Sequence, residues 1–347
     1  MPIHPLSALK PLAMALAVLV APATATAQEF EKNILTGGPT GTYIQIGRDI
    51  AGLLENCGQT LNVRESAGSL ENFLGVRQRR STQFGIVQSD VLEYLQTYSA
   101  QDPEIQRAID GVRIAFPLYD EEVHILASRE IETTADLSGA RVAVGVEDSG
   151  TFLTATLMLD LLDLEPAERL TIGPDASLER LRAGEIDAFF YVAGAPTAIF
   201  TGSDIDPEKF HLLPITDDVL RTVYTPTEIA AGTYPFQDGA VEVVAVKAVL
   251  MTYEYNPRRN DYHAQSCIAV SDVANLIATQ FDTLKETGHP KWQKVDLGDI
   301  PPGWEVSNCV NAGLSPSYAS SCVPAPVVPE NQTNSVYRQR ICDAIGC

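Results

Sequence analysis

Residues 33–54 read NILTGGPTGTYIQIGRDIAGLL and combine a short strand, a glycine-rich turn and the start of a helix. After the turn, apolar residues recur at helical spacing: Ile46, Ile50, Leu53 and Leu54. Glycine lets the backbone approach a bound group closely, and the following helix directs free N–H groups and its positive dipole end at that group. The turn therefore favours an anion. The same pattern also occurs as a plain strand-to-helix connection with Thr42 as the helix cap, and this alternative stays open.

Two more units of this kind follow. Residues 61–64 predict a strand that leads into the loop 65–69 and a helix, with Ser69 as the N-cap. A third strand, 84–87, leads into Gln88-Ser89-Asp90 and another helix. In an open parallel sheet, the loops after the carboxyl ends of the strands lie along one edge. We therefore expect the three loops to converge on one crevice.

Residues 112–128 contain two extended runs, which we interpret as the crossing into a second lobe. Glu121 and Glu122 lie between the runs. Adjacent residues of an extended segment point to opposite faces, so we expect a solvated hinge turn at these residues and not an acid–base pair.

The second half of the chain repeats the design. A strand at 141–145 leads into the loop 146–151 and a helix, and a later strand leads into the loop 192–196. Loops from two lobes would then face each other like a clamp.

Composition limits the possible functions. The first 27 residues have the pattern of a secretory signal, with Lys10, an apolar run from Leu12 to Val20 and small residues before Gln28. The run is too short to span a membrane, so we expect a soluble, periplasmic mature protein without an evident lipid anchor. A net charge of −21 argues against nucleic acid as a partner.

The six cysteines of an exported chain favour disulfides. We expect at least two, including one within 309–347, where four cysteines are clustered. Residues 301–347 are rich in Pro and Cys and would form either a disulfide-stapled cap on one lobe or a docking surface for another protein. The cap is favoured because a segment without its own core needs such staples.

Four motifs in the same order resemble the TAXI family of TRAP-transporter solute-binding proteins: GGPTGTY at 37–43 followed by Ile46-Gly47, ESAGSLEN at 65–72, GIVQSD at 85–90 and AGTYP at 231–235. The resemblance extends from about residue 33 to about residue 297. It implies a bacterial periplasmic receptor whose two lobes close on a small solute and deliver it to TRAP membrane permease subunits driven by an ion gradient. Known ligands of that family include acidic amino acids and dicarboxylates.

We therefore predict a two-lobed α/β periplasmic binding protein, type II-like, with a ligand cleft between the lobes. Residues 1–27 would be the signal peptide, 28–120 plus 228–300 lobe 1, 121–227 lobe 2 and 301–347 a C-terminal extension. The alternative is a secreted sensor or scavenger of the same fold without a permease. No nucleophile, metal or dinucleotide motif is present, so we expect no enzyme, no catalytic residue, no metal and no cofactor.

The residues expected to bind the solute are Gly41, Thr42, Tyr43, Ser66, Gly68, Ser69, Asn72, Gln88, Ser89, Asp90, Tyr119, Ser149, Gly150, Thr151, Gly194 and Tyr224. The loops assigned to the crevice contain no Arg or Lys, so a carboxylate would be held by hydroxyls and by backbone N–H groups at helix starts. Asp90 would either pair with an amino group or cap its helix. A glutamate-like amino acid is expected first and a dicarboxylate second, a choice that rests on the resemblance.

Overall fold

The computed structural model describes residues 1, 30–39 and 41–322. The chain divides into two units, residues 1–30 and 31–347. Of the first unit only Met1 and Phe30 are described, so the expected signal peptide lies almost wholly outside the described residues.

Ten strands and thirteen helical segments make up the described part of the second unit. The strands are β1 (Asn33–Leu35), β2 (Asn62–Arg64), β3 (Thr82–Gln88), β4 (Val112–Ser128), β5 (Arg141–Ala143), β6 (Glu168–Leu170), β7 (Ala188–Ala193), β8 (Phe210–Leu212), β9 (Thr225–Ile229) and β10 (Val241–Tyr253). The helices are α1 (Thr42–Glu55), α2 (Ser69–Gln78), α3 (Val91–Tyr98), α4 (Pro103–Gly111), η1 (Thr134–Leu137), α5 (Gly150–Leu161), α6 (Pro174–Arg182), α7 (Ala198–Thr201), α8 (Asp218–Val223), α9 (Asp261–Thr279), α10 (Phe281–Thr287), η2 (Pro290–Lys294) and α11 (Asn308–Gly313).

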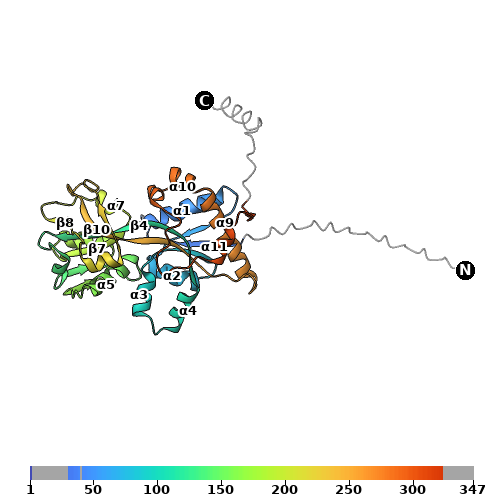
Figure 1. Ribbon diagram of the computed structural model, residues 1–347, viewed down its shortest axis with the longest axis horizontal. Coiled ribbons are helices and arrows are strands. Elements are labelled where there is room, and N and C mark those ends of the chain that lie inside the picture. The colour runs from blue at the N-terminus through green and yellow to red at the C-terminus, as the bar shows by residue number, and fades with distance from the viewer. Residues whose placement is uncertain (2–29, 40, 323–347) are drawn as a thin grey trace, which may run out of the picture. The chain divides into compact units, whose positions relative to one another are not determined.

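The strands form one sheet in the order β2-β1-β3-β10-β4-β7-β5-β6, with β8 beside β4 and β9 beside β10. Pairing is parallel among β1, β2 and β3 and among β5, β6 and β7. The two long strands β4 and β10 pair with each other in antiparallel fashion and run from one lobe into the other (Figure 1). The two extended runs expected at 112–128 are therefore one continuous strand, and the hinge turn expected at Glu121-Glu122 was wrong.

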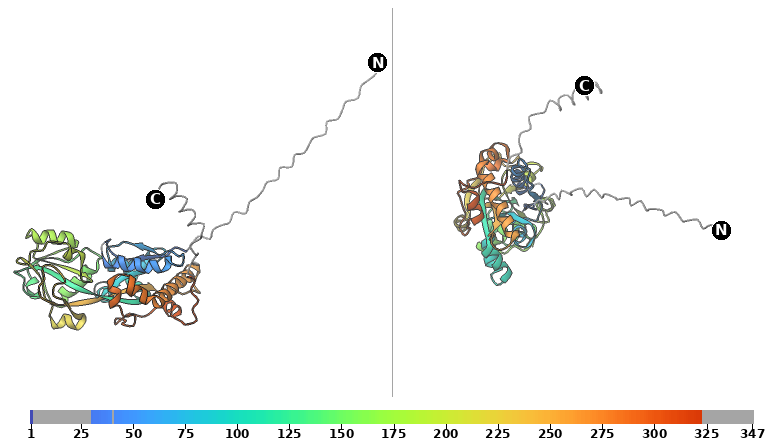
Figure 2. Two further views of the ribbon diagram at one scale, coloured as in Figure 1. Left: turned by 90° about the horizontal axis from the view of Figure 1, so that it is seen from above. Right: turned by 90° about the vertical axis from the view of Figure 1, so that its right-hand side faces the viewer.

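Each lobe has its own hydrophobic core. Strands and helices alternate along the chain, and the fold is a two-lobed α/β fold (Figures 1 and 2). In the first lobe, α1 and α9 cover one face of the sheet and α2, α3 and α4 cover the other. In the second lobe, the core includes Ile229, Tyr234 and Val243. The chain thus returns to the first lobe along β10 near Lys247. This differs from the sequence-based return at 228, because β9 pairs with β10 inside the second lobe.

Helix α5 joins the two lobes through an apolar contact. Leu153 and Leu157 of this helix are buried in the core formed by α2, α3 and α4 of the first lobe. The Leu153 side chain is fully buried. Separating the lobes would expose both leucines to water, so the structure describes a closed arrangement of the lobes.

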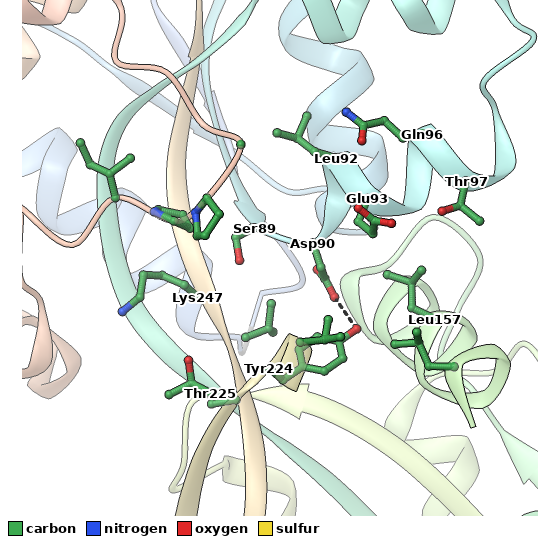
Figure 3. Close-up of a pocket in the computed structure, with 18 of the residues that line it drawn as sticks. Ser89, Asp90, Leu92, Glu93, Gln96, Thr97, Leu157, Tyr224, Thr225 and Lys247 are labelled. Carbon is green, nitrogen blue, oxygen red and sulfur yellow. Dashed lines mark hydrogen bonds between the residues drawn. The ribbon is translucent and has the colours of Figure 1, made fainter. Parts of the chain in front are cut away.

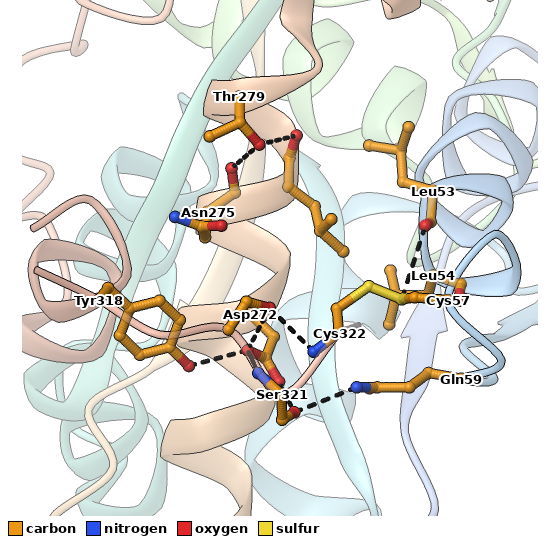
Figure 4. The surroundings of a disulfide bond; sticks show 12 residues. Leu53, Leu54, Cys57, Gln59, Asp272, Asn275, Thr279, Tyr318, Ser321 and Cys322 are labelled. Atoms are coloured by element: carbon orange, nitrogen blue, oxygen red, sulfur yellow. Dashed lines mark hydrogen bonds between the residues drawn. A yellow bond between two sulfur atoms is a disulfide. The ribbon is translucent and has the colours of Figure 1, made fainter. Parts of the chain in front are cut away.

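The C-terminal segment up to Cys322 packs on the first lobe. Trp304 is buried in that lobe's core, and the carboxylate of Asp272 in α9 accepts hydrogen bonds from Tyr318, Ser320 and Ser321 (Figure 4). Disulfides join Cys57 to Cys322 and Cys267 to Cys309. The expectation of at least two disulfides is confirmed. A bridge within 309–347 would require Cys342 and Cys347, which lie outside the described residues.

We predict that the Cys57→Ala/Cys322→Ala variant has a free energy of unfolding lower by about 2–5 kcal/mol, because the bridge restricts a very long loop of the unfolded chain. Urea unfolding without reductant measures the change, and Cys267→Ala/Cys309→Ala serves as the matched comparison. A loss of less than about 0.5 kcal/mol in both variants would contradict the packing of this segment on the lobe.

Candidate functional site

The first residues of four helices, two from each lobe, surround one cavity of about 480 Å³, which we call the helix-end cavity. Its walls are Gly37, Gly38, Pro39, Gly41, Thr42, Tyr43, Ser66, Ala67, Gly68, Ser69, Gln88, Glu121, Gly145, Val146, Ser149, Gly150, Thr151, Pro174, Asp175, Phe190, Tyr191, Val192 and Ala193. The helices α1 and α2 belong to the first lobe, and α5 and α6 belong to the second. Because each helix start carries partial positive charge and N–H groups without helical partners, the arrangement is suited to an anion.

The local sequence explains why these helices begin at the cavity. Gly41 in extended conformation is the N-cap of α1, and no side chain of the described residues caps that helix. Gly68 is the N-cap of α2 with φ 134°, a conformation that L side chains rarely adopt. The expected N-cap role of Ser69 was therefore wrong, since its hydroxyl instead accepts the N–H of Gln88 at 3.0 Å. Ser149 caps α5 by accepting the N–H of Phe152 at 3.1 Å.

The starts of α2 and α5 also contact each other across the lobes. The backbone N–H of Leu70 donates to the carbonyl of Asp148 at 3.1 Å, and the N–H of Glu71 donates to the same carbonyl at 3.4 Å. A Cβ on Gly68 would lie 3.2 Å from the Gly150 nitrogen. Two N–H groups of α2 are thus already occupied in this arrangement, and the remaining capacity for an anion lies mainly with α1, α5 and α6.

Among the described residues that line the cavity there is no Arg or Lys, but there are two carboxyl groups, Glu121 and Asp175. Glu121 is buried in the middle of β4 and accepts a hydrogen bond from the Tyr43 hydroxyl at 2.6 Å. Burial raises the pKa of Glu121 to about 8, although the Tyr43 hydrogen bond and the charge of Lys291 oppose this shift. Glu121 is therefore mostly protonated at neutral pH and does not repel an anion.

The structure brings together ten of the sixteen expected site residues around the helix-end cavity: Gly41, Thr42, Tyr43, Ser66, Gly68, Ser69, Gln88, Ser149, Gly150 and Thr151. Several of their side-chain oxygens also form hydrogen bonds with neighbouring residues of the protein. The Thr151 hydroxyl accepts the N–H of Val192 at 3.1 Å, and that of Ser66 donates to Asn72 Oδ1 at 2.6 Å. A hydroxyl that accepts a backbone N–H keeps its own proton, so Ser149 and Thr151 remain able to donate to a ligand.

Three expected residues lie behind the walls of the helix-end cavity. Asn72 is buried and donates to the carbonyls of Thr36 and Ile86, which ties α2 to β1 and β3. Tyr119 is fully buried and does not line the cavity. Gly194 allows a close approach, because a Cβ there would lie 2.5 Å from Lys291 Cε and 3.1 Å from the Tyr119 ring.

The remaining three expected residues, Ser89, Asp90 and Tyr224, line a different cavity of about 740 Å³ between α3 and α5 (Figure 3). We call it the α3–α5 cavity. Asp90 Oδ2 accepts hydrogen bonds from Thr154 at 2.9 Å and from Tyr224 at 3.2 Å, both in the second lobe. These bonds connect the lobes. Asp90 therefore does not line the helix-end cavity. The carboxyl groups available there to an amino group of a solute are those of Glu121 and Asp175.

Sequence reasoning missed Glu121, Tyr191 and Asp175 as lining residues. Glu121 was missed because a pair of glutamates between two extended runs is typical of a solvated turn. A signal was present in the uninterrupted extended pattern on both sides, which allows a single strand with one glutamate on each face.

No group of residues that would hold a metal ion is found in the described part of the chain, and none of the described helices is both long and apolar enough to cross a membrane.

Residues 34–263 match the family described as the NMT1-like family, a match that covers most of both lobes. The chain belongs to the NMT1-like family. Solved structures with similar chain traces include a protein of Bordetella bronchiseptica RB50, at 13% identity and a TM-score of 0.47, covering 85% of this chain and 93% of that one.

Two further structures are similar to this NMT1-like protein. A TctC solute-binding protein from Polaromonas has 14% identity and a TM-score of 0.40, covering 72% of this chain and 88% of its own. The ligand-binding component of an ABC-type import system from Staphylococcus aureus, with zinc bound, has 11% identity and a TM-score of 0.43, covering 79% and 88%. Because these sequence identities and TM-scores are low, the similarities do not indicate which ligand this protein binds.

The raised pKa of Glu121 predicts a pH-dependent stability. Between 4.5, its ordinary value, and about 8, the folded protein holds a proton that the unfolded chain has released. The free energy of unfolding therefore falls as pH rises through this range, by up to about 1.4 kcal/mol per pH unit from this group. Glu121→Gln should remove the contribution of this group to the decrease of the free energy of unfolding with pH.

Urea unfolding at a series of pH values measures the slope. Asp175→Asn is the matched control, because this carboxylate lies at the same cavity but is exposed. A slope in Glu121→Gln identical to that of the unsubstituted protein would contradict the shifted pKa.

Proposed function

We propose that this protein is a periplasmic solute-binding receptor of the TAXI type, which captures a small carboxylate-bearing solute in the helix-end cavity and delivers it to an ion-gradient-driven TRAP permease. The observation that carries the proposal is the convergence of four helix starts from two lobes on one cavity. Capture and release would be its whole activity, without a chemical reaction. The permease and the periplasmic location rest on the sequence motifs and the N-terminal signal pattern.

A carboxylate in this cavity would be bound by neutral donors. The first N–H groups of α1 and α5 border the cavity, and the hydroxyls of Thr42, Ser149 and Thr151 lie beside them. Each hydrogen bond to a charged acceptor is worth roughly 1.5–3 kcal/mol net, and the helix dipoles add to it. Several such bonds offset the desolvation of one carboxylate in a closed cavity.

An amino acid fits the cavity better than a purely acidic solute. Glu121 lies in the cavity wall with an acceptor oxygen in addition to the one used by Tyr43, and Asp175 lies at the start of α6. An ammonium group beside Glu121 would stabilise the ionised carboxyl and form a charge-assisted hydrogen bond with it. A glutamate-like amino acid is therefore our first candidate and a dicarboxylate such as 2-oxoglutarate the second.

The alternative is a secreted sensor or scavenger domain that binds the same solute without a permease. The cavity is the same in both cases, so the genes that neighbour this one in the genome would distinguish the two.

We predict that thermal unfolding shifts upwards with amino acids or dicarboxylates and stays unchanged with sugars. The physical reason is that only a carboxylate uses the unpaired N–H groups of the helix starts. A differential-scanning fluorimetry screen over the three classes measures the shift. A reproducible shift with sugars alone would overturn the carboxylate assignment.

We further predict that Gly150→Ala lowers the affinity for the solute by about tenfold or more. A Cβ at Gly150 would lie 2.0 Å from Gln88 Oε1 and 2.7 Å from Ser69 Oγ, so these buried side chains or α5 would have to shift from the arrangement seen here. Gly173→Ala is the matched control, since a Cβ at this helix start would make an ordinary contact of 3.7 Å with Val146. Isothermal titration calorimetry measures both. Equal affinities in the two variants would contradict closure at Gly150.

A further inference from the structure

The α3–α5 cavity lies apart from the helix-end cavity and is the larger of the two. Its walls come from both lobes: α3 and the segment 299–303 from the first, and α5, residues 223–225 and the adjoining part of β10 from the second (Figure 3). Much of the lining is apolar, including Leu92, Leu157, Leu161, Val223, Ile300 and Pro301. A volume of about 740 Å³ falls in the range of sites for small organic ligands.

The residues that line this cavity include more carboxyl groups than cationic groups. Lys247 is held between Asp120 and Asp299 at 2.8 Å each, so its charge is already matched. Asp160 pairs with Arg169 at 3.5 Å and also accepts the Tyr98 hydroxyl.

Two carboxyl groups of the lining, Asp90 and Glu93, form no ion pair with a cation in the part of the chain that the structure describes. Glu93 forms no ion pair with any described residue. Asp90 uses Oδ2 for Thr154 and Tyr224, while its Oδ1 is out of contact with solvent and has no hydrogen-bond partner in the described part of the chain. A buried carboxyl oxygen without a donor is unfavourable, and a donor supplied from the cavity would remove that deficit.

We propose that the α3–α5 cavity is a second binding site, for a small organic cation that carries an ammonium group on an apolar body. The ammonium would lie between Asp90 and Glu93 and supply the missing donor. The apolar body would pack against Leu92, Leu157 and the ring of Tyr224, which also offers a favourable face for a cation. Because both lobes form the walls, such a ligand would stabilise the closed arrangement.

The test is isothermal titration calorimetry of the full exported chain with 2-phenylethylammonium chloride and, as a neutral probe of the same shape, 2-phenylethanol. We expect the amine to bind about tenfold more tightly than the alcohol, which corresponds to one charge-assisted hydrogen bond. Asp90→Asn, which keeps the size of the side chain, should remove most of this preference. Asp175→Asn, which removes a carboxylate from the helix-end cavity, should keep it.

A second pair of variants changes an exposed residue and therefore leaves the buried side chains in place. Leu161 is exposed at the rim of the α3–α5 cavity. Leu161→Arg should lower the amine affinity by roughly two- to threefold, whereas Leu161→Glu should not lower it. The proposal is overturned if amine and alcohol bind alike or neither binds, if Asp90→Asn keeps the preference, or if Asp175→Asn loses it. These outcomes leave the helix-end cavity and its solute unaffected.

Discussion

The continuity of β4 and β10 is the constraint on which the rest of the structure depends. Because both strands pass through both lobes as an antiparallel pair, the lobes share one hydrogen-bonded sheet and are not joined by loops. The parallel strands on either side then direct their carboxyl ends towards the junction between the lobes, where α1, α2, α5 and α6 begin. Glu121 lies near the crossing point of β4, which is why a buried carboxyl faces the helix-end cavity.

The junction contains two buried carboxyl groups, Asp90 and Glu121. Burial raises the pKa of Asp90 to about 7 and that of Glu121 to about 8, and the charge of Asp90 contributes to the shift of Glu121. Both groups accept a hydrogen bond from a tyrosine hydroxyl. The donor to Asp90 is Tyr224 of the other lobe, and the donor to Glu121 is Tyr43 at the start of α1. A cation that binds near either group favours its ionised form, so the protonation of these carboxyls couples to what the junction binds.

The sequence predicted the parts of this architecture that are encoded locally. The strand, glycine turn and helix of residues 33–54, the alternating units in both halves and the convergence of the loops after Gly41, Gly68 and Gly150 all follow from short patterns. The hydroxyls of Thr42, Ser149 and Thr151 lie at one cavity because each helix start follows its strand end closely.

The remaining features depend on pairings between distant segments. Glu121 lies opposite Val246 of β10 and is hydrogen-bonded to Tyr43 of α1, and a local reading of two adjacent glutamates cannot include these distant segments. Asp90 lies one residue beyond Ser89 at the end of its loop, where α5 of the other lobe covers it, so Thr154 and Tyr224 become its partners. The disulfide partners of Cys309 and Cys322 lie 42 and 265 residues away, and spacing alone does not select them.

We propose that the two lobes close on a small carboxylate-bearing solute held by helix starts. Mass spectrometry of the small molecules that gently purified protein releases on denaturation tests this proposal. We expect one dominant compound with a carboxylate, close to one molecule per chain. Recovery of a sugar or another uncharged compound at that stoichiometry, with no carboxylate present, would contradict it.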